Sequence, residues 1–125
     1  MTPQPMICVR DVEASSRWYQ AALGLKSGHG GAEYEMLMAG DVMALQLHHW
    51  DAHEHPHIGN PDQPHGNGVV LWFFEKDVDG ACERAKKAGA QVLEELHFNP
   101  LAHHREFWLR DPDGYVIAVS GEFQG

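Results

Sequence analysis

The sequence predicts an α+β fold made of two tandem βαβββ modules, and two observations carry this prediction. An aspartate-capped helical pattern occurs twice, as Asp11-Val12-Glu13-Ala14 and as Asp77-Val78-Asp79-Gly80. A glycine, Gly24 or Gly89, follows each helix at nearly the same distance from its cap. Short β-branched and aromatic runs flank both helical segments, as expected for strands. The two halves of the chain therefore form an internal repeat.

The first module is expected to begin with a strand over Met6–Arg10, followed by a helix over Val12–Leu23. Asp11 is suited to cap this helix, and Gly24 is suited to end it. The apolar spacing predicts a buried helix stripe of Val12, Trp18, Tyr19, Ala22 and Leu23. Three more strands are predicted over Leu25–Ser27, Tyr34–Met38 and Val42–His48, with a flexible turn over Gly28–Gly31.

The second module repeats this order. A nearly continuous apolar strand is expected over Gly68–Glu75, and Asp77 is suited to cap a helix from Val78 to about Ala88. Three strands are then predicted over Ala90–Leu96, His104–Arg110 and Tyr115–Ser120. The last two are joined by Asp111-Pro112-Asp113-Gly114, in which Pro112 presets φ and Asp111 can bond to the turn backbone.

A histidine-rich segment over residues 49–67 separates the modules. It contains His49, His53, His55, His57 and His65 together with three prolines, and it has no periodicity, so a long loop is expected. On such a loop the H-x-H-x-H spacing imposes no metal geometry, and a solvated loop is the favoured interpretation. We expect a single domain over residues 1–125, with module one at about 4–48 and module two at about 68–121.

The composition excludes several classes of function. The net charge is −9, from 18 acidic and 9 basic residues, which argues against binding to nucleic acid or to an anionic membrane. No apolar run has membrane-spanning length, and the N-terminus lacks the pattern of a secretory signal, so a cytoplasmic location is expected. Cys8 and Cys82 have no CxxC spacing and are expected to be free thiols.

The closing strand–DPDG–strand hairpin resembles that of the glyoxalase / bleomycin-resistance / extradiol-dioxygenase (vicinal oxygen chelate) superfamily. The D-V-E-x-S-x-x-W-Y-x-x-x-L-G-L pattern of residues 11–25 is similar to the first helix of that family. The resemblance implies that the two modules curl their mixed sheets into a cup that encloses a ligand. It also implies a homodimer.

The resemblance places four inward-pointing metal ligands on Gln4, Gln46, Val70 and Ala118. Val70 and Ala118 cannot coordinate a metal, and two neutral amides alone make a poor divalent site. No metal and no other cofactor are therefore expected. A one-residue register error would bring in other side chains, and His48 already shares a face with Gln46.

Strand alternation predicts which side chains line the cup. The expected lining is Gln4, Met6 and Cys8; Ala44, Gln46 and His48; Val70, Trp72 and Phe74; and Val116, Ala118 and Ser120. From these, the candidate ligand-binding residues are Gln4, Met6, Gln46, His48, Val70, Trp72, Phe74 and Ala118. The alternative, a cup filled as core, stays open. Arg105 and Glu106 could form an anion clamp and a general base, but an exposed strand start or a subunit contact is favoured.

The favoured function is binding of a small, partly aromatic or apolar molecule without catalysis, as in the bleomycin-resistance branch. The negative charge favours a cationic ligand, with stacking on Trp72 and Phe74 and orientation by Gln4, Gln46 and His48. The alternative is a metal-dependent lyase, isomerase or dioxygenase whose ligands have moved, for example to His48 and a loop histidine. A third possibility is a domain that only associates with other proteins.

Overall fold

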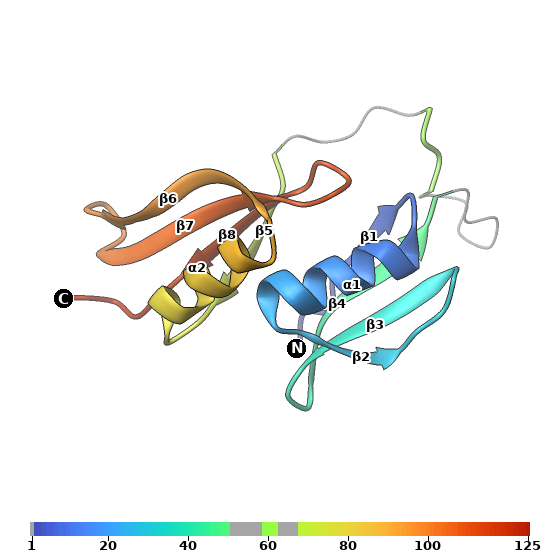
Figure 1. The fold of residues 1–125 in the computed structure, drawn as a ribbon, viewed down its shortest axis with the longest axis horizontal. Helices are drawn as coiled ribbons and strands as arrows, with labels where there is room; N and C mark the ends of the chain where they lie inside the picture. Colours follow the sequence, from blue (N-terminus) through green and yellow to red (C-terminus); the bar gives the residue numbers. More distant parts are fainter. Residues whose placement is uncertain (1, 51–58, 63–67) are drawn as a thin grey trace. The chain divides into compact units, whose positions relative to one another are not determined.

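The computed structural model describes residues 2–50, 59–62 and 68–125 (Figure 1). The chain divides into two compact units, Met1–Gly66 and Asn67–Gly125. Each unit contains one β-strand, one helix and then three strands, in the order predicted for a βαβββ module. The α+β fold with tandem βαβββ modules is therefore confirmed. In the part of the chain that the structure describes, no helix is long and apolar enough to cross a membrane.

The first unit holds a mixed four-stranded sheet and one helix. Its elements are β1 (Met6–Val9), α1 (Val12–Leu23), β2 (Lys26–His29), β3 (Tyr34–Ala39) and β4 (Val42–His49). The strand order is β1-β4-β3-β2, in which β1 runs parallel to β4 and the other neighbours are antiparallel. The predicted turn over Gly28–Gly31 begins later than expected, because β2 extends to His29, which pairs with Met36 after a register shift between Ser27 and His29.

Helix α1 packs on β2, β3 and β4. The Asp11 side chain accepts a hydrogen bond from the Ala14 amide at 3.0 Å, and Gly24 ends the helix in the left-handed conformation, as predicted. The buried residues of α1 are Val12, Ser15, Ser16, Tyr19 and Ala22.

The predicted stripe of α1 is therefore wrong at Trp18 and Leu23, which are only half-buried. Ser15 and Ser16 are buried in their place, and Ser16 contacts a carboxylate beneath the helix. The hydroxyl groups of Ser16 and Ser27 donate to the two oxygens of Glu35 at 2.6 and 3.0 Å. Apolar periodicity cannot find such a polar contact.

The second unit repeats the architecture. Its elements are β5 (Val70–Phe74), α2 (Val78–Lys87), β6 (Gln91–Asn99), β7 (His104–Arg110) and β8 (Val116–Ser120). The strand order is β5-β8-β7-β6, with β5 parallel to β8 and the other neighbours antiparallel. Strand β6 extends further than predicted, because Phe98 and Asn99 still pair with the start of β7.

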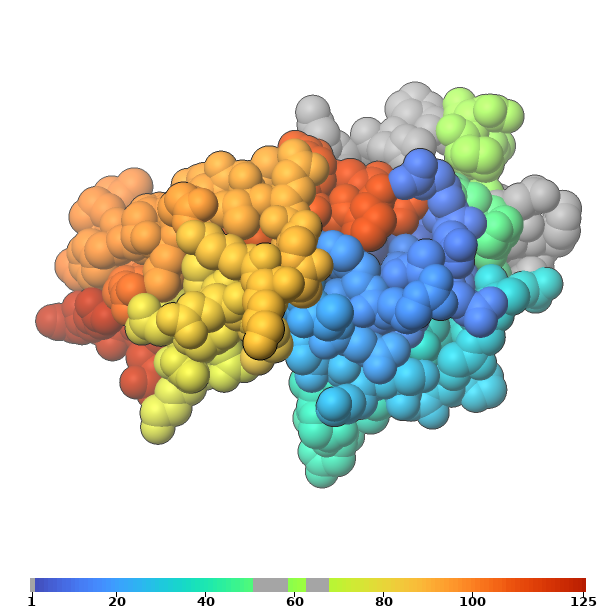
Figure 2. Space-filling view, in the orientation of Figure 1, coloured from blue at the N-terminus to red at the C-terminus, as the bar shows by residue number. Residues whose placement is uncertain are grey.

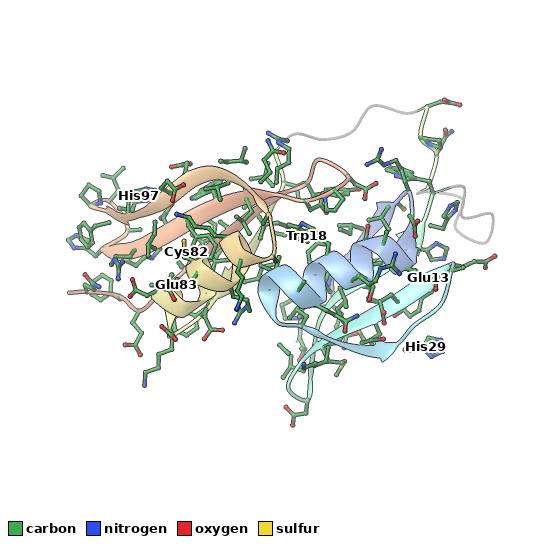
Figure 3. All side chains as sticks on the ribbon, viewed as in Figure 1. Glu13, Trp18, His29, Cys82, Glu83 and His97 are labelled. Carbon is green, nitrogen blue, oxygen red and sulfur yellow. The ribbon has the colours of Figure 1, made fainter. Side chains whose placement is uncertain are left out.

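Helix α2 packs on β6, β7 and β8 and buries one face of the sheet. The core residues of this unit are Leu71, Val78, Ala81, Cys82, Ala85, Phe107, Leu109, Ile117 and Val119. In Figure 2, residues of α2 are drawn in yellow at the surface of this unit. Figure 3 shows Cys82 on α2, where its thiol is buried and burial raises its pKa.

The DPDG turn forms as predicted. The Asp111 side chain accepts hydrogen bonds from the amides of Asp113 and Tyr115 at 2.9 and 2.8 Å, and Gly114 has a φ of 94°. A side chain that binds its own turn backbone in this way fixes the turn locally. This turn sets the register of β7 against β8, which determines the open side of the sheet described below.

Replacing Phe107 by alanine is expected to lower the free energy of unfolding by about 3–5 kcal/mol, because its ring is fully buried under α2. Leu101→Ala is the matched control. Leu101 lies in the connection between β6 and β7 and is 93% exposed, so its loss should change stability by less than about 0.5 kcal/mol. Urea denaturation followed by circular dichroism measures both, and equal effects would contradict the assignment of the core.

Candidate functional site

The sheet face that points away from α2, the open face, carries aromatic and polar side chains. Successive residues of a strand point to opposite faces. Phe107, Leu109 and Ile117 belong to the core beneath α2, so their neighbours in the same strands lie on the open face. The open face comprises Val70, Trp72 and Phe74 of β5, Val116, Ala118 and Ser120 of β8, and His104, Glu106, Trp108 and Arg110 of β7.

Two indole rings meet on the open face. Ala118 pairs with Trp72 on one side and with Trp108 on the other. The ring centroids of Trp72 and Trp108 are 5.5 Å apart, and the rings are nearly perpendicular, at 82°. This edge-to-face arrangement is one that aromatic pairs prefer. Ala118 is fully buried, and its small side chain leaves room for the rings to approach.

Trp72 is exposed, although the N–H group of its indole is hydrogen-bonded within the protein. Its Nε1 donates a hydrogen bond to Ser120 Oγ at 2.8 Å, while 46% of the residue stays accessible. Its neighbours on the same side of β5, Val70 and Phe74, are also exposed. Val70, Trp72 and Phe74 of β5 therefore form an accessible apolar strip. Within this strip, the hydrogen bond to Ser120 fixes the position of the Trp72 indole.

Glu106 is the buried charge of the open face, with only 3% of the residue exposed. Trp108 Nε1 donates to its Oε2 at 2.6 Å. Asn99 Nδ2 and His104 Nε2 lie 2.9 and 2.8 Å from its Oε1. Because a buried carboxylate needs such partners, these contacts fix the positions of all four side chains.

Burial alone would raise the pKa of the Glu106 carboxyl. The hydrogen bonds from Trp108, Asn99 and His104 outweigh this effect, and the pKa is lowered from its ordinary value. Glu106 is therefore ionised at neutral pH and places a fixed negative charge beneath the aromatic residues.

Of the two favoured interpretations of Arg105 and Glu106, the exposed strand start is wrong for Glu106, which is buried, and the subunit contact stays a prediction. Glu106 is buried on the open face, and Arg105 points the other way, toward α2. The two guanidinium nitrogens of Arg105 each donate to one oxygen of Asp79 at 2.8 Å, so this residue is already paired and is not an anion clamp. His103 lies in the turn before β7, and its ring contacts Phe98 and Phe123.

In the first unit, the candidate residues lie at the β1–β4 pair. Met6 pairs with Gln46, and Cys8 pairs with His48. The Gln46 amide is engaged at both ends, because its Oε1 accepts from the Tyr34 hydroxyl at 2.6 Å and its Nε2 donates to the Gln4 carbonyl at 2.9 Å. Gln46 is thus less available to a ligand than the sequence suggests, and His48 is buried.

The candidate residues fall into two groups of four. Val70, Trp72, Phe74 and Ala118 belong to the second unit, while Gln4, Met6, Gln46 and His48 belong to the first. Gln4 is exposed and precedes β1, and Met6 is half-buried. The loop histidines His53, His55, His57 and His65 lie outside the described residues.

The residues at the positions that the resemblance assigns to metal ligands do not fit a divalent metal. Val70 and Ala118 have no donor atom, and both ends of the Gln46 amide are bonded within the protein. Across residues 2–50, 59–62 and 68–125, no group of three or more histidine, cysteine, aspartate or glutamate side chains is placed to hold a metal ion.

The centre of the open face consists of Asn99, His104, Glu106 and Trp108, of which only Glu106 was weighed from the sequence as a general base. A signal for part of it was present. Phe107 and Leu109 are the apolar residues of an alternating strand, so Glu106 and Trp108 had to share the opposite face with Ala118. Asn99 had no such signal, because it reaches Glu106 from the neighbouring strand.

The fold and this site together define a tandem βαβββ protein with an aromatic and acidic open face. The model of the Glyoxalase/Bleomycin resistance protein/Dioxygenase superfamily matches residues 3–119. The chain therefore belongs to this superfamily, as the sequence resemblance predicted. Curated protein sequences give no significant match to the chain.

Solved structures share the fold. A protein of unknown function from Agrobacterium tumefaciens str. C58 has a TM-score of 0.79 and 23% identity, over 98% of this chain and 94% of that one. A glyoxalase/bleomycin resistance protein/dioxygenase family enzyme from Burkholderia phytofirmans PsJN gives 0.77 and 21%, over 94% and 95%. TioX from Micromonospora sp. ML1 gives 0.72 and 17%, over 97% and 98%. At these identities the likeness shows the fold alone.

Replacing Glu106 by glutamine is expected to lower the free energy of unfolding by about 1–3 kcal/mol at neutral pH, because the buried donors lose their charged acceptor. The folded-state pKa of Glu106 is lowered, so its ionised form stabilises the fold above the unfolded pKa, and this contribution is lost as the pH falls through the folded pKa. The difference between wild type and Glu106→Gln should therefore shrink in acid.

Urea denaturation at a series of pH values measures this difference. The control is Glu83→Gln, since Glu83 is exposed on α2 (Figure 3). A difference for Glu106→Gln that stays constant from neutral to strongly acidic pH would show that the carboxylate does not stabilise the fold as described.

Proposed function

We propose that the chain binds a small, partly aromatic or apolar organic molecule on the open face of the second unit. The observation that carries this proposal is the exposed indole of Trp72. Its N–H is already bonded to Ser120, so the accessible part of the ring offers an apolar face and no free donor. A fixed aromatic surface favours planar or apolar ligands, because little side-chain freedom is lost on binding.

The neighbouring side chains extend this surface. Phe74 is 64% exposed and Val70 is also exposed, on the same side of β5 as Trp72. Exposed apolar residues grouped in this way are typical of a binding surface, whereas single ones are common anywhere. We propose that the ligand lies along β5 with its ring against Trp72.

The charge of the site favours a ligand that is neutral or positive. Glu106 holds a buried negative charge next to Trp108, and the chain as a whole has a net charge of −9. An indole face also attracts cations through its quadrupole. Because the Glu106 carboxylate is itself nearly inaccessible, it would act on the ligand through its field rather than by direct contact.

Orientation of the ligand by Gln4, Gln46 and His48 stays a prediction. In the first unit, the hydrogen bonds of Gln46 with Tyr34 and Gln4 would have to break before its amide could bind a ligand. The metal-dependent alternative needs His48 together with a loop histidine. The histidines at positions 53, 55, 57 and 65 lie outside the described residues.

A thermal-shift screen of small aromatic amines, aromatic acids and neutral aromatics tests the proposed function. Aromatic amines and neutral aromatics are expected to raise the melting temperature, and Trp72→Ala should weaken their affinity about tenfold or more, as for loss of an aromatic anchor. Phe123→Ala is the control, because Phe123 is an exposed aromatic residue outside the open face. Equal affinity in wild type and Trp72→Ala would overturn the proposal.

A further inference from the structure

His104 is a basic side chain that lies beside the exposed indole of Trp72. The centroids of the His104 and Trp72 rings are 6.0 Å apart. His104 Nε2 lies 2.8 Å from Glu106 Oε1. Glu106 is ionised and can only accept hydrogen bonds, so Nε2 carries the hydrogen of this contact. In the neutral imidazole, the lone pair then belongs to Nδ1.

The Nδ1 atom of His104 is not used by the contact with Glu106. It makes no hydrogen bond with the described part of the chain, where His104 bonds through Nε2. Every buried side-chain nitrogen or oxygen in that part of the chain has a partner. Since Nδ1 has none there, it is not fully buried, and the His104 ring, whose side chain is 17% exposed, lies beside Trp72.

Glu106 is held so that it can support a proton on His104. Trp108 and Asn99 each donate to the carboxylate, and they keep it in place independently of His104. A fixed carboxylate on one imidazole nitrogen selects the tautomer, and it stabilises the imidazolium that forms when the other nitrogen takes up a proton.

We propose that His104 is a general base, positioned by Glu106, that removes a proton from a small aromatic molecule lying on Trp72. The inference rests on the proposed function, because it uses the same surface to hold the substrate. It adds chemistry to that surface and assigns an activity that needs only side chains of the second unit.

The step is balanced without an oxidant or another reactant. A C–H bond of the substrate breaks, and its proton moves to Nδ1 of His104. The electron pair stays on the substrate, where it is delocalised onto a carbonyl oxygen or expels a leaving group. The imidazolium then returns the proton to the product or to water. The reaction class is therefore isomerisation or elimination by proton abstraction.

The other charged side chains of this face have their own partners. Glu94 and His97 of β6 lie opposite Trp108 and Glu106. His97 Nδ1 contacts the Glu95 carbonyl at 2.7 Å, and its Nε2 lies 3.7 Å from Glu94. Arg110 Nη1 donates to the Gly114 carbonyl at 2.9 Å. His104 differs from these side chains. Its Nδ1 makes no hydrogen bond with the described part of the chain, and its ring lies close to Trp72.

The first test needs no substrate. Long-range ¹H–¹⁵N spectra of the histidine rings report which nitrogen carries the proton. For neutral His104, we expect a protonated Nε2 and an unprotonated Nδ1 in the wild type, and a mixture of tautomers in Glu106→Gln. Glu83→Gln should leave the His104 signals unchanged. An Nδ1-protonated ring in the wild type would overturn the inference.

The second test uses 5-nitrobenzisoxazole, a planar aromatic probe that eliminates when a base removes its C–H proton. The released nitrophenolate is followed by absorbance. We expect saturable turnover by the wild type and a loss of about 100-fold in His104→Gln, which keeps a donor for Glu106 but has no basic nitrogen. His29→Ala, on β2 of the first unit (Figure 3), should keep the wild-type rate.

Binding is measured separately with 5-nitroindole, a planar analogue that cannot eliminate, by saturation-transfer NMR. Binding that depends on Trp72, together with equal turnover in wild type and His104→Gln, would overturn the proton-transfer inference and leave the proposed function standing. Absence of Trp72-dependent binding would count against both. Thermal unfolding of His104→Gln checks that the variant folds.

Discussion

One helix can bury only one face of a four-stranded sheet, and each unit of this protein has a single helix. In the second unit α2 covers the face formed by Phe107, Leu109 and Ile117. The other face cannot be buried by the same helix, so its side chains are free to differ in character from a core. This constraint explains why an exposed tryptophan and a buried glutamate can lie on strands whose opposite face carries the buried residues Leu71, Phe107 and Leu109.

The charge of Glu106 organises that second face. A carboxylate so far from solvent is stable only if its oxygens are bonded, and its partners are Trp108, Asn99 and His104. These contacts orient the indole of Trp108, which meets Trp72 edge to face. They also orient the imidazole of His104, which lies beside Trp72. The network that satisfies the buried charge therefore also fixes an aromatic surface and a basic nitrogen, which are the parts that a small-molecule site requires.

The fold was largely predictable because its signals are local. The aspartate caps, the glycines that end the helices and the DPDG turn each act within a few residues, and all of them form as expected. The site was less predictable because its contacts join different strands. Ala118 could be placed on the open face from the sequence. The contact between the Trp72 and Trp108 rings on either side of it depends on the pairing register of the strands. The burial of Glu106 depends on Asn99 in another strand, and the burial of Ser16 depends on Glu35.

The most direct test of the account follows the four tryptophan indole N–H signals by NMR during titration with a small aromatic amine. We expect the signals of Trp72 and Trp108 to shift together and to saturate, because both rings belong to the open face. The signals of Trp18, on α1 of the first unit (Figure 3), and Trp50 serve as internal references that should not move. Saturable shifts at Trp18 or Trp50, with Trp72 unaffected, would contradict the account and place binding elsewhere.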